Sequence, residues 1–206
     1  MILPFMDQAV LFNQIAFGER LDEGTNAKLL NKQLTLYRCP SDPYTKKTWV
    51  MKDEKGADVL ELAAANYVAS FGTGDLAKCH KLKTGETCTG DGIFYHNECT
   101  SIADIRDGTS YTLAVGERVG TTKGDRFSTW SGVIAKGKDP LARILGTSDR
   151  VLDAKEHHAA NYLSPHKGGS HFLLMDGAVR FLKSDLDLKL FQALTTRAGG
   201  EELPDF

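Results

Sequence analysis

The dipeptide Asp176-Gly177 constrains the fold of this chain more than any other feature of the sequence. It lies between two apolar runs, residues 172–175 and 178–181. An Asp-Gly pair in that position is typical of a two-residue hairpin turn in which both residues have positive φ. The sequence therefore predicts two antiparallel strands joined at residues 176 and 177.

The predicted turn also sets which side chains of the hairpin face the core. With two residues in the turn, Leu174 lies opposite Val179, and Phe172 lies opposite Phe181. Because side chains alternate along a strand, these four residues share one face, which we expect to be the core side. Residues 173, 175, 178 and 180 would then share a second, mixed face.

The rest of the chain predicts short helices, strands and long loops. A helix follows the hairpin, because Ser184 is a suitable N-cap, apolar residues between 186 and 194 share one face, and Gly199-Gly200 can end it. The other expected elements are a helix over 4–16, a weak helix over 26–36, a loop or short hairpin over 46–62, strands over 66–72, 111–119 and 127–134, and surface loops over 72–98 and 135–165.

Length and charge exclude some classes of protein. The 206 residues suffice for one domain over residues 1–206. The 25 basic and 27 acidic residues nearly balance, so no net field favours nucleic acid or an anionic membrane. No run approaches the roughly 18 apolar residues of a membrane span, and the first residues lack the basic start of a signal peptide. We therefore expect the chain as it stands to be soluble.

Four cysteines allow more than one interpretation: Cys39, Cys79, Cys88 and Cys99. An even number in an exported chain indicates two disulfides, with three connectivities open. We favour Cys79–Cys88, which closes a local loop, and a Cys39–Cys99 bond would follow by elimination. The alternatives are free thiols and zinc, since His80 adjoins Cys79 and His96 precedes Cys99 by three residues. Zinc has less support, because no cysteine pair has the short spacing of structural zinc sites.

Six segments resemble, in order, the motifs of one family of envelope proteins. Most distinctive is a histidine, nine residues and then Asp-Gly, which His166 and Asp176-Gly177 reproduce. The other matching segments are residues 1–8 ("LLPYLEQ"), 39–43 ("CPSDP"), 66–72 ("NYAGNxG"), 104–118 ("DITDGTSNT…GER") and 194–201 ("LATRAGGE"). The chain thus resembles the planctomycete prepilin-like proteins of the former unknown-function family 1559.

This resemblance implies a fold, a location and partners. It implies an α+β, pilin-like fold, in which an N-terminal helix packs on an antiparallel β-sheet with long surface loops, a C-terminal hairpin and a helix. It also implies export to the cell envelope, in the periplasm or at the surface, which agrees with disulfide bonds. The implied partners are other pilin-like subunits or secretion components. Membrane attachment would depend on an N-terminal helix that this chain does not contain. The resemblance implies no biochemical activity.

One histidine is a candidate for chemistry. His166, with Asp176 and Glu117, provides a histidine and carboxylate set that can bind a metal, and oxygen ligands would favour calcium. The alternative is structural: Asp176 belongs to the turn, His166 hydrogen-bonds the neighbouring backbone, and Glu117 forms an ion pair with Arg118 at a strand end. A second histidine-rich segment, residues 156–158, is expected to be a solvated loop, since adjacent side chains diverge.

Aromatic residues are the candidates for ligand binding, since such rings combine apolar faces with polar rims that suit sugars or peptides. They are Trp49, Trp130, Tyr95 and Tyr162, with Tyr44 beside them in the same group. They are scattered along the chain, and we expect half or more of them to pack in the core.

Three hypotheses follow, in order of preference. The first is a structural or assembly protein of the envelope, with no cofactor and no catalytic activity. The second is an extracellular module that binds a glycan or solute through its long loops. The third is a metal-dependent enzyme centred on His166. No nucleophile elbow and no phosphate-binding glycine loop occurs in the sequence.

Overall fold

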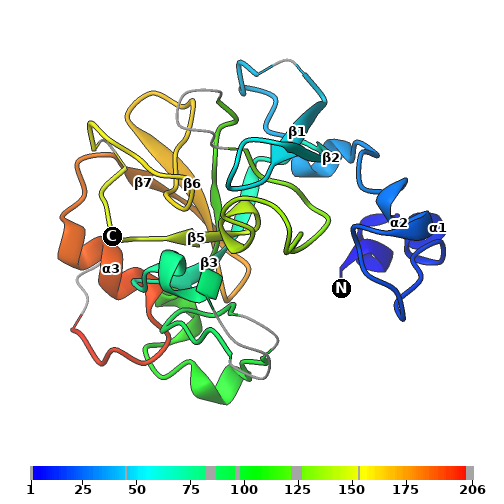
Figure 1. Ribbon diagram of the computed structural model, residues 1–206. Helices are drawn as coiled ribbons and strands as arrows, with labels where there is room; N and C mark the ends of the chain where they lie inside the picture. The colour runs from blue at the N-terminus through cyan, green and yellow to red at the C-terminus, as the bar shows by residue number, and fades with distance from the viewer. Residues whose placement is uncertain are drawn as a thin grey trace.

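The computed structural model describes residues 2–44, 46–81, 87–95, 98–121, 127–152 and 154–202. Within these residues the chain forms a five-stranded sheet, a separate two-stranded sheet and several short helices, so it is α+β, as predicted (Figure 1). The strands are β1 (Thr48–Lys52), β2 (Asp58–Ala63), β3 (Tyr67–Gly72), β4 (Leu113–Glu117), β5 (Leu145–Thr147), β6 (Gly169–Leu174) and β7 (Val179–Lys183). The α-helices are α1 (Ala9–Phe12), α2 (Gly24–Ala27) and α3 (Leu188–Thr195). The 3-10 helices are η1 (Leu3–Met6), η2 (Thr35–Tyr37), η3 (Leu76–Lys81), η4 (Ile102–Asp104), η5 (Thr109–Tyr111) and η6 (Leu141–Arg143).

The larger sheet has the strand order β5-β3-β4-β6-β7. Its neighbouring strands are antiparallel except β3 and β5, which are parallel. Helix α3, which begins at the N-cap Asp187, packs its apolar side on one face of this sheet. The buried cluster there includes Val68, Leu113, Phe172, Leu174, Tyr162, Phe191 and Leu194. The helix that covers the sheet is therefore C-terminal, which corrects the predicted N-terminal one.

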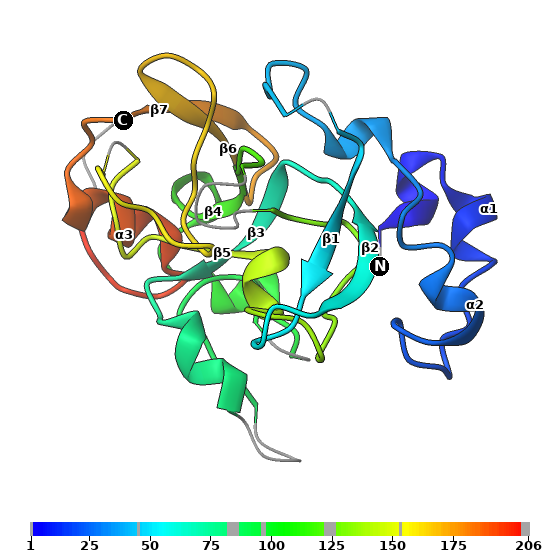
Figure 2. The same ribbon diagram turned by 45° about the horizontal axis from the view of Figure 1, so that its top comes forward.

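In place of the predicted helix over 4–16, the chain forms two short helices, η1 and α1, each of about one turn. Helix η1 ends at Asp7, whose φ of 56° is left-handed and interrupts helical hydrogen bonding before α1 begins. Both turns pack with Leu34 and Trp130 in a small separate cluster. Figures 1 and 2 show α1 and α2 beyond β1 and β2, away from α3. No helix among the described residues is long and apolar enough to cross a membrane.

Other predicted elements are shorter or displaced. The weak helix over 26–36 is limited to α2 and η2, while the alternative of a hairpin over 46–62 is confirmed by β1 and β2. Residues 127–134 contribute an isolated bridge between Ser128 and Ala65 rather than a strand. The described residues of the predicted 135–165 loop include η6 and β5, and β5 extends the sheet beside β3.

The C-terminal hairpin forms, but its register differs by one residue from the prediction. The Leu174 amide donates to the Ala178 carbonyl at 2.8 Å, which closes a three-residue loop, and only Gly177 of the Asp-Gly pair has positive φ, at 89°. This geometry belongs to a three-residue hairpin with a left-handed glycine. Val179 therefore pairs with Leu173, and Phe181 with His171.

The shifted register turns two predicted core residues outward. Phe172 and Leu174 are buried, as predicted, but Val179 is 63 % exposed and Phe181 is 44 % exposed. Leu182 occupies the core position instead. The sheet thus has a covered face under α3 and an open face that carries the side chains of His171, Leu173, Val179 and Phe181.

Candidate functional site

Three of the sequence motifs meet at Asn66, at the start of β3. Its side-chain oxygen accepts from the Cys39 amide at 3.0 Å, and its side-chain nitrogen donates to Asp42 at 2.6 Å and to the Arg118 carbonyl at 3.0 Å. Asn66 is fully buried, so these bonds replace contacts with water. The loop that carries Cys39 is therefore fixed against the end of β4.

Glu117, the last residue of β4, lies beside this loop and is only 4 % exposed. Its Oε2 accepts three hydrogen bonds, from Ser164 Oγ at 2.8 Å, Ser170 Oγ at 3.2 Å and the His171 amide at 2.8 Å. Burial alone would raise the pKa of Glu117, but these hydrogen bonds and the nearby His166 and His171 lower that pKa below its usual value. The carboxylate is therefore ionised, and Oε1 is free of the three bonds that hold Oε2.

His166 brings its ring to the same point from the segment that precedes β6. Its Nε2 lies 3.3 Å from Glu117 Oε1 and 3.7 Å from Cys39 Sγ. One oxygen of Glu117, one ring nitrogen of His166 and the sulfur of Cys39 thus lie close together, all within 4.8 Å of one another. His171 adds a second imidazole, whose ring centre is 4.9 Å from that of His166.

A groove of about 430 Å³ opens in front of these side chains on the open face of the sheet. Tyr67 and Val115 lie along it, and Leu173 and Val179 form the hairpin side. Tyr67 and Glu117 are direct partners across β3 and β4, so their side chains share this face. The polar cluster thus stands at one end of a largely apolar groove.

The motifs that build this cluster can be compared with known families. The family model SBP_bac_10, described as "Protein of unknown function (DUF1559)", matches residues 1–189. This chain belongs to the DUF1559 family. The match confirms the family that the sequence motifs indicated, and the description of DUF1559 names no function. No curated protein and no solved structure matches the chain.

The predicted trio of this DUF1559 protein is only partly brought together. His166 and Glu117 are in contact, whereas Asp176 lies in the hairpin loop, five residues further along the chain than His171. Asp176 accepts from the Ala178 amide at 2.8 Å, and this bond, with one from Ser110, lowers the pKa of Asp176. Cys39, which the sequence predicts in a disulfide, lies beside His166 in place of Asp176.

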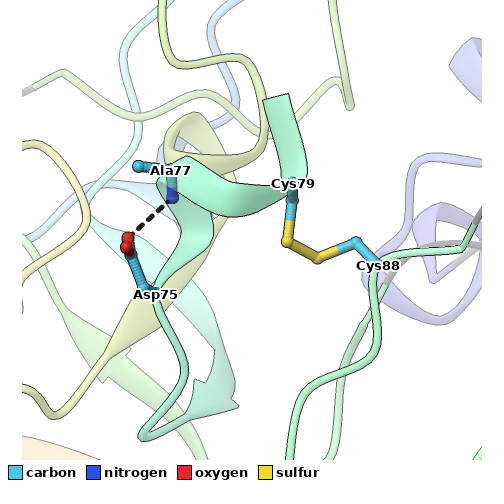
Figure 3. The surroundings of a disulfide bond; sticks show 4 residues. All are labelled: Asp75, Ala77, Cys79 and Cys88. Atoms are coloured by element: carbon cyan, nitrogen blue, oxygen red, sulfur yellow. Dashed lines mark hydrogen bonds between the residues drawn. A yellow bond between two sulfur atoms is a disulfide. The ribbon is translucent and has the colours of Figure 1, made fainter. Parts of the chain in front are cut away.

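All four cysteines lie among the described residues, and one disulfide forms. Cys79, in the second half of η3, is bonded to Cys88 with their Cα atoms 5.3 Å apart, while Asp75 caps the start of the same helix by accepting from the Ala77 amide (Figure 3). Cys39 and Cys99 are free, which corrects the bond predicted by elimination. The reason is that Cys39 is buried against His166 while Cys99 is exposed. Of the histidines in the zinc alternative, His96 and the His80 side chain lie outside the described residues, and Cys79 is bonded.

The aromatic candidates do not converge on one cleft. Trp49, beside Tyr44, stacks on Phe127 in one cluster, Trp130 packs with the N-terminal turns, and Tyr162 is buried under α3. Tyr95 belongs to a fourth cluster and lies under the Arg197 guanidinium. Each ring is therefore explained by its local packing.

The Glu156-His157-His158 run does not form a histidine cluster around an ion among the described residues. His158 Nε2 lies 2.8 Å from Asp149 Oδ2, and both side chains are more than a third exposed. This pair holds two parts of the loop that follows β5 together.

The sequence does contain a signal for Cys39, because Cys39, Glu117 and His166 each belong to a family motif. Their wide spacing along the chain, however, gives no reason to place the three side chains in one site.

Proposed function

We propose that this DUF1559 protein is a structural component of the cell envelope, with its domain outside the cytoplasm. The observation that carries the proposal is that the residues of the family motifs hold parts of this fold together. Most of their polar side chains are satisfied by the protein's own backbone rather than directed at a cleft. We assign the domain no catalytic activity.

Arg118 is the clearest example of this use. It is fully buried, and it donates to the carbonyls of Ala142, Leu145, Ala160 and Asn161 and to the Ser128 hydroxyl. A buried guanidinium surrounded by backbone acceptors fixes those segments to one another. The Gly-Glu-Arg motif therefore supports a role in holding the long loop around β5 on the sheet.

Asp107 has a similar part at the other end of the domain. Its carboxylate accepts from the Gly199 amide at 2.7 Å and from the Gly200 amide at 2.8 Å. Arg197 adds hydrogen bonds to the carbonyls of Gly90 and Gly92. Thus the Asp-Gly-Thr-Ser motif and the closing Arg-Ala-Gly-Gly motif hold each other, as a structural role requires.

The Cys79–Cys88 disulfide supports a location outside the cytoplasm. Disulfides persist in the periplasm and on cell surfaces but are rare in a reducing cytosol. The family resemblance implies the same location and adds pilin-like subunits or secretion components as partners. We include both in the proposal.

Exposed apolar side chains give such partners a surface to bind. Phe5 is 89 % exposed and Val10 is 75 % exposed, and Ile2 and Phe17 lie exposed in the same N-terminal segment. Large apolar side chains exposed on one short segment are candidates for contact with another protein. We propose another envelope subunit of this family as the occupant.

The test uses the full-length protein in cells that produce it. Thiols are alkylated before lysis, the cells are fractionated, and a photo-reactive residue replaces Phe5 in one strain and the exposed Lys55 in a control strain. We expect the envelope fraction to contain the protein with Cys79 and Cys88 oxidised, and crosslinks to an envelope subunit from position 5 only. Recovery from the cytoplasm with both thiols alkylated, or equal crosslinking from both positions, would contradict the proposal.

A further inference from the structure

Cys39, Glu117 and His166 are the exception to this structural use of motif residues, because their functional atoms face one another at the end of a groove. We propose that they bind a divalent transition-metal ion, zinc in the first place, and leave a fourth coordination position open to that groove. This inference goes beyond the structural role and stands or fails independently of it.

The separations of the three atoms fit a tetrahedral zinc ion. With Zn–S near 2.3 Å and Zn–N and Zn–O near 2.0–2.1 Å, tetrahedral ligands lie about 3.3–3.6 Å from one another. Here Cys39 Sγ lies 3.7 Å from His166 Nε2, and Glu117 Oε1 lies 3.3 Å from the same nitrogen. The third pair lies within 4.8 Å, so a small movement of one side chain completes the site.

The same distances argue against a Cys-His-acid catalytic triad. In such a triad the nucleophile faces one ring nitrogen and the carboxylate holds the other. In this protein the sulfur of Cys39 and the oxygen of Glu117 both approach Nε2 of His166. Three donors that converge on one point are the arrangement of ligands around an ion.

The donor set selects the kind of metal. Thiolate, imidazole and carboxylate together suit zinc, whereas calcium and magnesium require oxygen ligands. Replacing the expected Asp176 by Cys39 therefore changes the favoured ion from calcium to zinc. Zinc also suits the number of ligands, since three protein ligands with one open position are common for it.

An outer shell holds the ligands in place. Ser164, Ser170 and the His171 amide fix Oε2 of Glu117, which leaves Oε1 directed at His166. Asn66 fixes the backbone of Cys39 by accepting from its amide at 3.0 Å. Partners of this kind orient metal ligands and raise affinity, and their loss typically lowers metal affinity about 10–100-fold.

A bound ion would also stabilise the fold, because its three ligands come from different segments of the chain. Cys39 comes from the loop after η2, Glu117 from the end of β4 and His166 from the segment before β6. A bound ion would tie these three segments together. The groove beside Leu173 and Val179 would leave its fourth position accessible to water or to a ligand with an apolar body.

The experiment begins with the purified full chain after removal of metal by a chelator. Titration with Zn²⁺ is followed by calorimetry, and titration with Co²⁺ is followed by absorption, because a cobalt–thiolate bond produces a charge-transfer band. We expect one ion per chain and a cobalt–thiolate band for the wild-type protein. Absence of that band in the folded wild-type protein would overturn the proposal without the need for any variant.

Variants then identify the ligands. Cys39→Ser should abolish the cobalt–thiolate band, and His166→Gln should weaken zinc binding at least 10-fold, while the matched controls Cys99→Ser and His158→Gln should leave both measurements unchanged. Circular dichroism of each metal-free variant establishes that it is folded. If folded Cys39→Ser and His166→Gln bind zinc as the wild type does, the assigned ligands are wrong.

Discussion

Glu117 and Arg118 are adjacent in the chain, but their side chains serve opposite sides of the molecule. Glu117 directs its carboxylate to His166 and His171 at the open face, while Arg118 extends into the interior toward the carbonyls of Leu145 and Ala160. Alternation along a strand explains the divergence. One dipeptide therefore contributes a candidate metal ligand and the main internal support of the loop around β5.

Replacement of Arg118 by methionine should destabilise the fold strongly. Methionine fills part of the volume but leaves several buried carbonyl groups without donors, and each such group costs about 1–3 kcal/mol. We expect Arg118→Met to lower the free energy of unfolding by at least about 3 kcal/mol. Urea unfolding followed by circular dichroism measures this change.

The matched control for this prediction is Arg106→Met, since the Arg106 side chain is exposed. Exposed substitutions usually change stability by less than about 0.5 kcal/mol. Similar unfolding midpoints for the two variants would show that the internal hydrogen bonds of Arg118 do not support the fold.

The sequence predicted elements where short-range signals decide the structure. The hairpin around Asp176-Gly177, the strand that became β3 and the local Cys79–Cys88 disulfide all depend on residues close together in the chain. The family assignment also followed from short motifs, each recognisable by itself. The predicted ion pair between Glu117 and Arg118 is corrected, because adjacent strand residues point apart.

Long-range relationships could not be obtained in this way. Cys39 and His166 are separated by 127 residues, and their contact depends on Asn66 holding one loop and on β4 and β6 being neighbours. The prediction of an N-terminal helix is wrong for a local reason, because the left-handed conformation of Asp7 ends η1 and the residue type alone does not indicate such a break. Helix α3 then covers the sheet through its own apolar side.

The Cys79–Cys88 disulfide should contribute measurably to stability. It links residues nine apart, and closing a loop of that length in the unfolded chain is worth about 2–3 kcal/mol. The double variant Cys79→Ala/Cys88→Ala should therefore melt roughly 4–12 °C lower than the wild type in calorimetry. The exposed free thiol provides the control, and Cys99→Ala should melt within about 1 °C of wild type.

Asp149 should make stability depend on pH in the acid range. Burial alone would raise the pKa of Asp149, but hydrogen bonds from His158, Thr147 and Asn161 and the charge of His158 lower that pKa to about 2. Because the folded pKa lies below the unfolded value, the stabilisation is complete above about pH 5 and disappears as the pH falls toward 2. Partial exposure limits it to about 1–2 kcal/mol.

Urea unfolding of wild type and Asp149→Asn at several pH values measures this contribution. The difference in unfolding free energy should shrink as the pH falls from 5 to 3, by the linkage relation. Glu54→Gln, at an exposed position, controls for the loss of one charge. A wild-type advantage over Asp149→Asn that does not change with pH would count against the assigned hydrogen bonds.

The loop of the β6–β7 hairpin offers a test of the left-handed conformation of Gly177. Gly177 has a φ of 89°, and a Cβ added there would meet no atom within 4 Å, so the cost of Gly177→Ala arises from the left-handed conformation. We expect Gly177→Ala to lower the free energy of unfolding by about 1 kcal/mol. Gly18 also has open space but lacks positive φ, so Gly18→Ala should be neutral or slightly stabilising.

The register of the β6–β7 hairpin is tested by two serine substitutions. Because the shifted register places Val179 and Phe181 on the open face, Phe181→Ser should lower the free energy of unfolding far less than Leu182→Ser. The two-residue turn requires the reverse order, and urea unfolding of both variants distinguishes the two registers.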